Sequence, residues 1–464
     1  MSLIKSISGI RGTIGGEVGE NLTPLDTVKF AAAYGTWIKA RNKDTKEIKV
    51  VVGRDARISG AMISSLVTNT LIGLGIHVID LGLSTTPTVE VAVPLEKAHG
   101  GIILTASHNP KEWNALKLLN EKGEFLNGAD GKEILEFVER DAYQFAEVDD
   151  LGVYTENKTY VEKHIQEVLN LELVDVEAVK KAKFKVVLDA VNSTGGIFIP
   201  TLLEAMGVAC VKLYCEPNGH FPHNPEPLKE HLGAISELVV KEQADFGIVV
   251  DPDVDRLALI SEDGSMFGEE YTLVACADYV LGKLGGGNTV SNLSSSRALR
   301  DVTEKHGGTY TASAVGEVNV VTAMKETNTV IGGEGNGGVI YPESHYGRDS
   351  LVGVALFLSH LATSGKSCKE LRESYPAYFM SKNKIQLTPD LDVDGILEAM
   401  AEKYKNEQVN TIDGVKVDFA KEWLHLRKSN TEPIIRIYTE SGSQTAADAL
   451  AQRAIDEIKE IAGI

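Results

Sequence analysis

One pattern of hydrophobic and polar positions occurs three times along the chain. It consists of an apolar run rich in β-branched residues, a polar or glycine turn, a segment with helical periodicity, and a second apolar run. The copies span residues 47–82, 184–214 and 288–316. Such runs predict buried strands, and the segments between them predict helices packed on a sheet. The alternation predicts an α/β fold class, and its repetition predicts three similar α/β domains.

Two other segments have patterns of their own. Residues Thr23 to Asp26 read Thr-Pro-Leu-Asp, which places a capping hydroxyl before a proline and a carboxylate three residues later. This pattern predicts a helix that continues through Ala40. Near the C-terminus, predicted strands at 414–420, 423–429 and 433–441 precede an amphipathic helix at 445–462. The end of the chain therefore predicts a smaller α+β domain.

The chain has 464 residues, which is too long for a single hydrophobic core. Polar helices or loops interrupt the strand-rich pattern at three places, and these places divide the chain into four predicted domains. The predicted domains span residues 1–155, 156–256, 257–372 and 373–464. We expect the first to carry a reactive serine, the second a metal site, the third a recognition loop and the fourth a phosphate-binding loop.

Composition is typical of a soluble protein, with 43% hydrophobic and 24% charged residues and no apolar run of membrane-spanning length. The N-terminal residues lack the apolar segment of a signal peptide. The four cysteines are Cys210, Cys215, Cys276 and Cys368. None of them forms a CxxC pair, which favours reduced thiols over a disulfide scaffold. We expect a cytoplasmic protein.

The net charge is -20, from 46 basic and 66 acidic residues. Nucleic acids and anionic membranes are bound through neutralisation of their phosphates, so this charge argues against both as main partners. A small anionic substrate remains compatible if basic residues gather locally. The basic residues in motif-like segments are Arg11, Lys117, Arg256, Arg427, Lys428 and Arg436.

Three aspartates alternate in the segment Asp251-Pro-Asp253-Val-Asp255-Arg256, between two short apolar runs. In an extended or looped segment, alternate side chains point the same way, and three carboxylates so placed repel one another unless a cation lies between them. Mg²⁺ prefers oxygen ligands and leaves positions for a phosphate. A calcium loop is the alternative, with Glu262 at its twelfth position. Arg256 stands where that loop needs glycine, so the segment favours a catalytic Mg²⁺ site.

Residues 104–110 read Leu-Thr-Ala-Ser-His-Asn-Pro, directly after a predicted buried strand. A serine in a turn is most often structural. At a strand end of an α/β fold, however, the Ser107 hydroxyl is placed to act as a nucleophile or to carry a phosphoryl group. His108 and Lys117 are further candidate catalytic residues. Lys117 alternates with apolar residues, which fits either a strand-edge lysine or a group that exchanges a proton with a substrate hydroxyl.

A glycine-rich segment at 332–338 reads Gly-Gly-Glu-Gly-Asn-Gly-Gly. It lacks the Lys-Ser/Thr pair of a P-loop and is not followed by a predicted helix as a dinucleotide-binding motif would be. Its glycines allow the backbone to approach a ligand, while Glu334 and Asn336 offer an acceptor and an amide to adjacent hydroxyls. A plain tight turn explains the spacing equally well.

A polar segment near the C-terminus has the composition of a phosphate cradle. It combines a guanidinium, hydroxyls, an amide and loop backbone N–H groups, which together suit phosphate oxygens. Its candidate residues are Arg427, Ser429, Asn430, Thr431 and, further along, Arg436. Taken singly, each of these would be an ordinary loop residue, and their co-occurrence is what favours the site.

Together, the four segments resemble the α-D-phosphohexomutase family over the whole chain and in the expected order. The resemblance implies three similar α/β domains with mixed sheets and a smaller C-terminal α+β domain around a central active-site cleft. It implies a resting enzyme phosphorylated on Ser107. It also implies a Mg²⁺ ion held by that phosphoserine together with Asp251, Asp253 and Asp255.

The resemblance further implies transfer of the phosphoryl group to a hexose monophosphate, through a hexose 1,6-bisphosphate that reorients and returns the other phosphate to the serine. Arg11, Arg256 and Lys117 would offset charge on the transferring group. Lys117 would be the general acid/base, and Glu334 and Asn336 would hold sugar hydroxyls. The distal phosphate would be bound by Arg427, Ser429, Asn430 and Thr431, with Arg436 nearby.

The chain departs from the family pattern at Asn336, at Gly338 and at Glu317, where serine, histidine, and histidine or aspartate are common. This form is similar to the archaeal-type branch often assigned as phosphoglucosamine mutase or as phosphomannomutase/phosphoglucomutase. The leading hypothesis is interconversion of glucosamine 6- and 1-phosphate, and the alternative is a phosphomannomutase/phosphoglucomutase. An inactive phosphosugar-binding protein is a remote third hypothesis. The sequence carries no signal for an oligomeric state.

Overall fold

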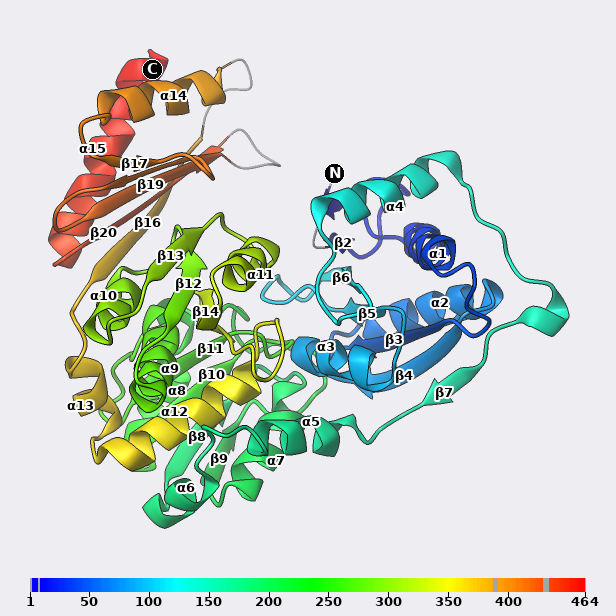
Figure 1. Ribbon diagram of the computed structural model, residues 1–464, viewed down its shortest axis with the longest axis horizontal. Coiled ribbons are helices and arrows are strands. Elements are labelled where there is room, and N and C mark those ends of the chain that lie inside the picture. The colour runs from blue at the N-terminus through cyan, green and yellow to red at the C-terminus, as the bar shows by residue number, and fades with distance from the viewer. Residues whose placement is uncertain (1, 7–8, 387–390, 429–433, 464) are drawn as a thin grey trace.

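The computed structural model describes residues 2–6, 9–386, 391–428 and 434–463. These residues form four sheets with helices packed on them (Figure 1). In Figure 1 the first unit lies at the right, the second and third adjoin one another at the lower left, and the C-terminal unit stands at the upper left. The predicted fold class, with three similar α/β units and a smaller C-terminal unit, is confirmed.

The first unit is built on a mixed sheet with strand order β1-β2-β6-β5-β3-β4-β7. Its strands are β1 (Ile4–Ser6), β2 (Gly9–Thr13), β3 (Lys49–Arg54), β4 (His77–Leu83), β5 (Gly101–Leu104), β6 (Trp113–Leu119) and β7 (Tyr154–Glu156). Its helices are α1 (Pro24–Arg41), α2 (Gly60–Gly73), α3 (Thr86–Leu95) and α4 (Gly128–Arg140), with the short 3₁₀ helix η1 (Val148–Asp150).

Helix α1 begins where the sequence predicts. The Thr23 side chain accepts a hydrogen bond from the Asp26 amide, the Asp26 carboxylate accepts one from the Thr23 amide, and Pro24 occupies the first turn. This reciprocal cap satisfies amide groups that have no partner inside the helix. The predicted start is therefore confirmed, and the helix ends at Arg41, one residue beyond the predicted end.

The second unit has strand order β11-β10-β8-β9 and the third β13-β12-β14-β15. The second contains α5 (Tyr160–Leu169), α6 (Val176–Ala182), β8 (Lys185–Asp189), α7 (Gly195–Ala205), β9 (Ala209–Leu213), η2 (Lys229–His231), α8 (Gly233–Lys241), β10 (Phe246–Val250) and β11 (Leu257–Ser261). The third contains α9 (Glu269–Leu284), β12 (Asn288–Asn292), α10 (Ala298–Lys305), β13 (Tyr310–Ser313), α11 (Glu317–Glu326), β14 (Thr329–Glu334), β15 (Gly338–Ile340), α12 (Ser350–Ser364) and α13 (Cys368–Glu373).

The C-terminal unit has an antiparallel sheet with strand order β16-β20-β19-β18-β17. Its elements are β16 (Phe379–Gln386), α14 (Val393–Lys403), β17 (Gln408–Asn410), β18 (Val415–Asp418), β19 (Trp423–Lys428), β20 (Ile434–Ser441) and α15 (Gln444–Ala462). The C-terminal strands and helix predicted from the sequence are confirmed in their described parts.

The first three units share one topology. In each, a first strand pairs in parallel with a second and a third strand, and a fourth strand runs antiparallel to the third. The loops between the third and fourth strands lie at 105–112, 251–256 and 335–337. Three motifs singled out in the sequence therefore occupy the same position in three related units. Because β11 pairs with β10, we propose that the second domain extends to Ser261, beyond the predicted limit at 256.

The units differ in how they are joined. The second and third share one apolar core, in which Phe357 of α12 contacts both Phe246 and Phe267 in edge-to-face geometry, with ring centroids 5.4 Å apart in each pair. The first and fourth units have apolar cores of their own. The first unit contacts the second through hydrogen bonds, among them the Thr86 amide to the Asp253 carbonyl at 2.9 Å. The shared core gives the second and third units a fixed relative position.

The state of the cysteines and the hydrophobicity of the helices were also predicted from the sequence. All four cysteines carry free thiols, two of them buried and two half-buried. Among the described residues, no helix combines the length and the hydrophobicity needed to cross a lipid bilayer.

Candidate functional site

The loops that follow β5 and β10 meet at Ser107. The Ser107 hydroxyl donates a hydrogen bond to Oδ2 of Asp251 at 2.8 Å, and its Oγ lies 3.4 Å from Nδ1 of His108. Ser107 has a φ of 49°, in the left-handed region that non-glycine residues seldom adopt. The Ser107 amide donates to the Thr105 hydroxyl at 3.0 Å. This bond helps to hold the strained turn that directs the serine toward the aspartates.

A buried arginine that the sequence analysis missed organises the serine loop. Arg57 donates hydrogen bonds to backbone carbonyls on both sides of the turn, those of Ser107, Asn109, Pro110 and Trp113. Its Nε lies 3.0 Å from Oδ2 of Asp55, which also accepts a bond from Thr105 at 2.6 Å. The only signal in the sequence was the charged run Gly-Arg-Asp-Ala-Arg directly after an apolar strand.

The three aspartates predicted as metal ligands lie together and are fully buried. One oxygen of each, from Asp251, Asp253 and Asp255, lies within 4.8 Å of the other two. The Oδ1 atoms of Asp253 and Asp255 have no hydrogen-bond partner within the part of the chain that the structure describes. Burial, together with the charges of its two neighbours, raises the pKa of Asp251 well above its usual range. Three clustered carboxylates with unpartnered oxygens fit a hard divalent cation.

The backbone of the aspartate loop is itself constrained. Val254 has a φ of 64°, although β-branched residues strongly disfavour the left-handed region. Oδ1 of Asp251 accepts hydrogen bonds from the amides of Asp255 and Arg256 at 3.1 and 3.2 Å. These bonds and the buried Val254 side chain hold the loop in a conformation that gathers the three carboxylates.

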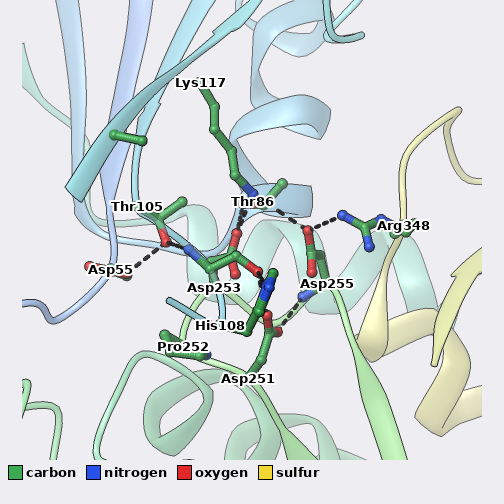
Figure 2. A network of polar contacts seen from close by, with 12 residues as sticks. Asp55, Thr86, Thr105, His108, Lys117, Asp251, Pro252, Asp253, Asp255 and Arg348 are labelled. Atoms are coloured by element: carbon green, nitrogen blue, oxygen red, sulfur yellow. Dashed lines mark hydrogen bonds and ion pairs between the residues drawn. The ribbon is translucent and has the colours of Figure 1, made fainter. Parts of the chain in front are cut away.

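Lys117, on β6, reaches the same aspartates from the first unit. Its Nζ lies 2.6 Å from Oδ2 of Asp253 and 3.5 Å from Oδ2 of Asp255, as Figure 2 shows. Burial lowers the pKa of Lys117, but the charges of these aspartates outweigh burial and raise it above its ordinary value. Thr86, at the start of α3, also donates to Oδ2 of Asp253. The first unit therefore places an ammonium and a hydroxyl against the carboxylate cluster.

Arg348 is a second site residue that the sequence analysis missed. Its Nη2 lies 2.7 Å from Oδ2 of Asp255, on the far side of that carboxylate from Lys117 (Figure 2). Its other nitrogens lie 2.8 Å from Glu317 and 3.2 Å from Glu334. A Cβ on Gly338 would stand 2.3 Å from the Arg348 side chain. The departure at Gly338 was the available signal, because glycine leaves the space that this arginine fills.

The glycine-rich segment forms the turn between β14 and β15. Glu334 accepts hydrogen bonds from Nδ2 of Asn292 at 2.8 Å and from the Gly316 amide at 3.2 Å. Burial would raise the pKa of Glu334, but Arg348 and these donors hold it below its usual value, so the carboxylate stays ionised. Oδ1 of Asn336 accepts from the Gly338 amide at 3.2 Å. Both predicted recognition residues therefore lie in one hairpin beside Arg348.

Cations from three units influence one another electrostatically. Burial, followed by the charges of Arg256 and Arg436, lowers the pKa of Arg11 on β2. The charges of Arg256 and Arg11, added to burial, also hold the pKa of His108 well below its usual range, so His108 is neutral near pH 7. Mutual repulsion of this kind in the absence of a ligand is typical of a site that binds an anion.

The C-terminal sheet carries a row of cations across neighbouring strands. Arg436 of β20 lies opposite Arg427 of β19 on one side and Lys384 of β16 on the other. Like charges in directly opposed positions destabilise a sheet unless an anion joins them. Asp413 pairs with Arg427 at 2.8 Å. Lys384 was not predicted. The predicted residues Ser429, Asn430 and Thr431 lie outside the described residues.

Comparison with known families assigns every unit. The chain matches the domains described as Phosphoglucomutase/phosphomannomutase, alpha/beta/alpha domain I at residues 3–145, domain II at 159–264 and domain III at 268–378. It matches the Phosphoglucomutase/phosphomannomutase C-terminal domain at residues 386–457. The matches occur in order and together cover most of the chain.

Individual relatives match over nearly their full length. The chain is 36% identical to a phosphoglucomutase/phosphomannomutase of Thermococcus kodakarensis, covering 97% of this chain and 98% of that protein. It is 32% identical to a phosphoglucosamine/phosphogalactosamine mutase of Sulfurisphaera tokodaii, covering 99% of both. The crystal structure of a phosphoglucomutase/phosphomannomutase family protein from Burkholderia thailandensis matches with a TM-score of 0.85 and 25% identity, over 99% of this chain and 98% of that one.

Proposed function

The chain belongs to the phosphoglucomutase/phosphomannomutase family and is a phosphohexomutase, and from this we propose that it interconverts glucosamine 6-phosphate and glucosamine 1-phosphate through a phosphorylated Ser107. The observation that carries the reaction site is the contact between the Ser107 hydroxyl and Asp251, at 2.8 Å within the buried aspartate cluster. A phosphoryl group on this oxygen adds about -1.5 to -2 charge next to three carboxylates. The cations around the site would offset this negative charge.

We propose that the aspartate cluster holds Mg²⁺. Asp251, Asp253 and Asp255 supply oxygen ligands, and a phosphoserine at Ser107 would add one more. The ion supplies electrostatic stabilisation of the phosphoryl group in transfer. The chain's own cations Arg11, Arg256 and Lys117 add to that stabilisation from the surrounding elements.

Transfer in either direction exchanges one oxygen–phosphorus bond for another. A hexose hydroxyl attacks the phosphorus, the bond from phosphorus to Ser107 Oγ breaks, and the product is a hexose 1,6-bisphosphate. Lys117, whose Nζ reaches the aspartate cluster, is placed to exchange the proton of the attacking hydroxyl. The bisphosphate then reorients, and its other phosphate returns to Ser107. Added hexose 1,6-bisphosphate is therefore expected to activate unphosphorylated enzyme.

The preference for an amino sugar rests on charge at the recognition hairpin. Glu317 and Glu334 share one guanidinium, that of Arg348, and Arg348 also pairs with Asp255. The 2-ammonium group of glucosamine phosphate would form ion pairs with these carboxylates, whereas a 2-hydroxyl would donate a hydrogen bond to them without the attraction between opposite charges. A phosphomannomutase/phosphoglucomutase is the second candidate. It is favoured by the 36% identity to the phosphoglucomutase/phosphomannomutase of Thermococcus kodakarensis.

The sugar preference is tested by kcat/KM for glucosamine, glucose and mannose phosphates, each with Mg²⁺ and a trace of the matching 1,6-bisphosphate. We expect the glucosamine substrate to be preferred by about 10-fold or more, because the attraction between the ammonium and a carboxylate about 4 Å away adds roughly 1 to 4 kcal/mol. Glu317→Gln removes a carboxylate but keeps the side chain's shape, so it should narrow this preference. Equal rates for all three sugars would assign the protein to the broad phosphomannomutase/phosphoglucomutase group, and inactivity on all three would favour a binding protein.

We propose that the phosphate that does not react is held by the C-terminal unit, through Arg427, Ser429, Asn430 and Thr431 with Arg436. The opposed cations Arg427, Arg436 and Lys384 support this role, because a phosphate would relieve their repulsion. The substrate partner is therefore a phosphosugar.

Four free thiols are consistent with the cytoplasmic location that we propose for the enzyme.

Replacing Arg427 with alanine is expected to raise KM for the hexose phosphate about 10- to 100-fold with a smaller change in kcat, because a charge-assisted bond to the distal phosphate is lost. Steady-state kinetics measure this. Lys428→Ala is the matched control: the next residue on the same strand is an exposed lysine paired with Asp394 at 2.6 Å. Equal KM values for wild type and Arg427→Ala would remove this residue from the phosphate site.

A further inference from the structure

A second cluster of metal-ligating side chains lies outside the serine site, where the first three units meet. His164 comes from α5 of the second unit, and His345 and Asp349 come from the segment before α12 in the third. Thr88 and Glu90, on α3 of the first unit, border the cluster. His164, Asp349 and Glu90 are each at most 1% exposed. No step of the proposed phosphoryl transfer uses these residues.

One carboxylate oxygen is the centre of the cluster. Oδ2 of Asp349 lies 2.9 Å from Nε2 of His164 and 3.2 Å from Nε2 of His345, and one ligand atom from each residue lies within 4.8 Å of the others. The other oxygen, Oδ1, caps α12 by accepting from the amides of Leu351 and Val352. The cap fixes the carboxylate and leaves Oδ2 facing both imidazoles.

The remote nitrogens of the two histidines also face polar partners. Nδ1 of His164 lies 2.8 Å from the Thr88 hydroxyl, and Nδ1 of His345 lies 3.4 Å from Oε2 of Glu90. In metal sites, a ligating histidine usually donates its other ring N–H to a carboxylate, a carbonyl or another acceptor, which sets the tautomer and the ring orientation. His164 has such a partner in Thr88, and Glu90 lies beside the corresponding nitrogen of His345.

Glu90 is the independent observation that points to a bound cation. Neither of its carboxylate oxygens has a hydrogen-bond partner among the residues that the structure describes. The chain approaches it closely, because a Cβ on Gly347 would stand 1.9 Å from Oε2. A buried carboxyl group without a hydrogen-bond partner is costly. A divalent cation between the histidines and Asp349 would balance the charges of Asp349 and Glu90, and would leave His345 free to donate its Nδ1 proton to Glu90.

We propose that His164, His345 and Asp349 bind a divalent transition-metal ion such as Zn²⁺ at the junction of the first three units, with Thr88 and Glu90 orienting the two imidazoles. Imidazole nitrogens with one carboxylate oxygen suit zinc, whereas the all-oxygen aspartate cluster suits Mg²⁺. The ion links α5 to the segment before α12, and through Glu90 it links both to α3. It would therefore fix the first unit, which carries Ser107, relative to the units that carry the aspartates.

The test uses the full-length protein, stripped with a chelator and dialysed into millimolar MgCl₂ to occupy the aspartate cluster. One equivalent of ZnCl₂ is then added, the protein is gel-filtered, and metal is measured by mass spectrometry. We expect about one zinc per chain and a higher Tm than without zinc. Co²⁺ in place of zinc should give the intense visible absorption of low-coordinate cobalt with nitrogen ligands, whereas an octahedral all-oxygen site absorbs weakly.

Variants separate this cluster from any other histidine. His345→Gln should lose the zinc, while His306→Gln should keep it, because His306 pairs with Asp278 elsewhere in the third unit. Glu90→Gln keeps all three ligands and should weaken zinc binding about 10- to 100-fold through loss of the partner of His345. If His345→Gln fails to fold, three measurements still test the proposal. These are the zinc stoichiometry of the wild type, its cobalt spectrum and the zinc affinity of Glu90→Gln.

Three results would overturn the proposal. These are a wild-type protein that retains no zinc after one equivalent, a cobalt spectrum of all-oxygen type, and His345→Gln protein that retains zinc as the wild type does.

Discussion

Replacing Ser107 with alanine is expected to reduce kcat by about 10⁴-fold or more, because the oxygen that carries the phosphoryl group is removed and the other site residues have nothing to act on. The fold should survive, since the Ser107 side chain contributes a hydrogen bond to Asp251 and little apolar packing. Steady-state kinetics with a hexose phosphate, Mg²⁺ and the matching 1,6-bisphosphate measure the effect.

Two readouts make the Ser107→Ala result specific. Wild-type protein incubated with the bisphosphate should gain one phosphoryl group by intact mass, and the variant should gain none. Ser65→Ala, at an exposed position on α2 where the hydroxyl is bonded only locally, is the matched control and should keep full activity. Turnover by Ser107→Ala at the wild-type rate would end the phosphoserine hypothesis.

Replacing Arg57 with methionine is expected to lower the free energy of unfolding by about 3–5 kcal/mol, because Asp55 would be left as a buried, unpaired charge. The carbonyls of Ser107 and Pro110 would also lose their donor. We expect kcat to fall by roughly 10²-fold as well, since misplacing a nucleophile by about 1 Å has an effect of that size. Urea unfolding and steady-state kinetics measure the two effects.

Conservative and distant replacements distinguish positioning from general damage. Arg57→Lys keeps the charge but cannot form the forked set of bonds, so it should recover much of the stability and less of kcat. Arg140→Met removes an arginine that is 74% exposed and should change neither quantity. If Arg57→Met keeps wild-type kcat at a temperature where it is folded, Arg57 does not position Ser107 for transfer.

The two variants test different parts of one arrangement. In the proposed reaction Ser107 supplies the reacting oxygen, whereas Arg57 acts through the backbone of the loop that presents it. Thr105 connects the two, since its hydroxyl donates to Asp55 and accepts from the Ser107 amide. The strained φ of Ser107 therefore persists because the surrounding bonds outweigh its cost.

Local patterns in the sequence were enough for the architecture. Strand and helix periodicities report which face of an element is buried, and for that reason they predicted three α/β units and an α+β unit. The Thr23 to Asp26 cap and the alternation of Asp251, Asp253 and Asp255 were equally readable, because each depends on residues a few positions apart. Ser107 was predicted as a candidate nucleophile from its place at a strand end.

Residues whose role depends on distant partners could not be identified in this way. In the sequence, Arg57 looked like an ordinary charged residue after a strand. Its role depends on hydrogen bonds to carbonyls about 50 positions away. Arg348 looked like a loop residue, yet it joins Asp255, Glu317 and Glu334. Burial converts such charges from solvated groups into parts of a site, and burial of a polar residue does not follow from periodicity.

Spacing along the chain was sufficient to predict the fold class and the helix and strand pattern, and to single out the serine and the aspartate cluster as candidates, since it sets which side chains share a face. Only the tertiary structure decided that three motifs occupy the same loop of three related units, and that Lys117 and Arg348 approach Asp255 from opposite sides. It also decided that His164, His345 and Asp349 meet at a junction of units. These contacts join residues up to 185 positions apart, and their distances are set by how the units pack.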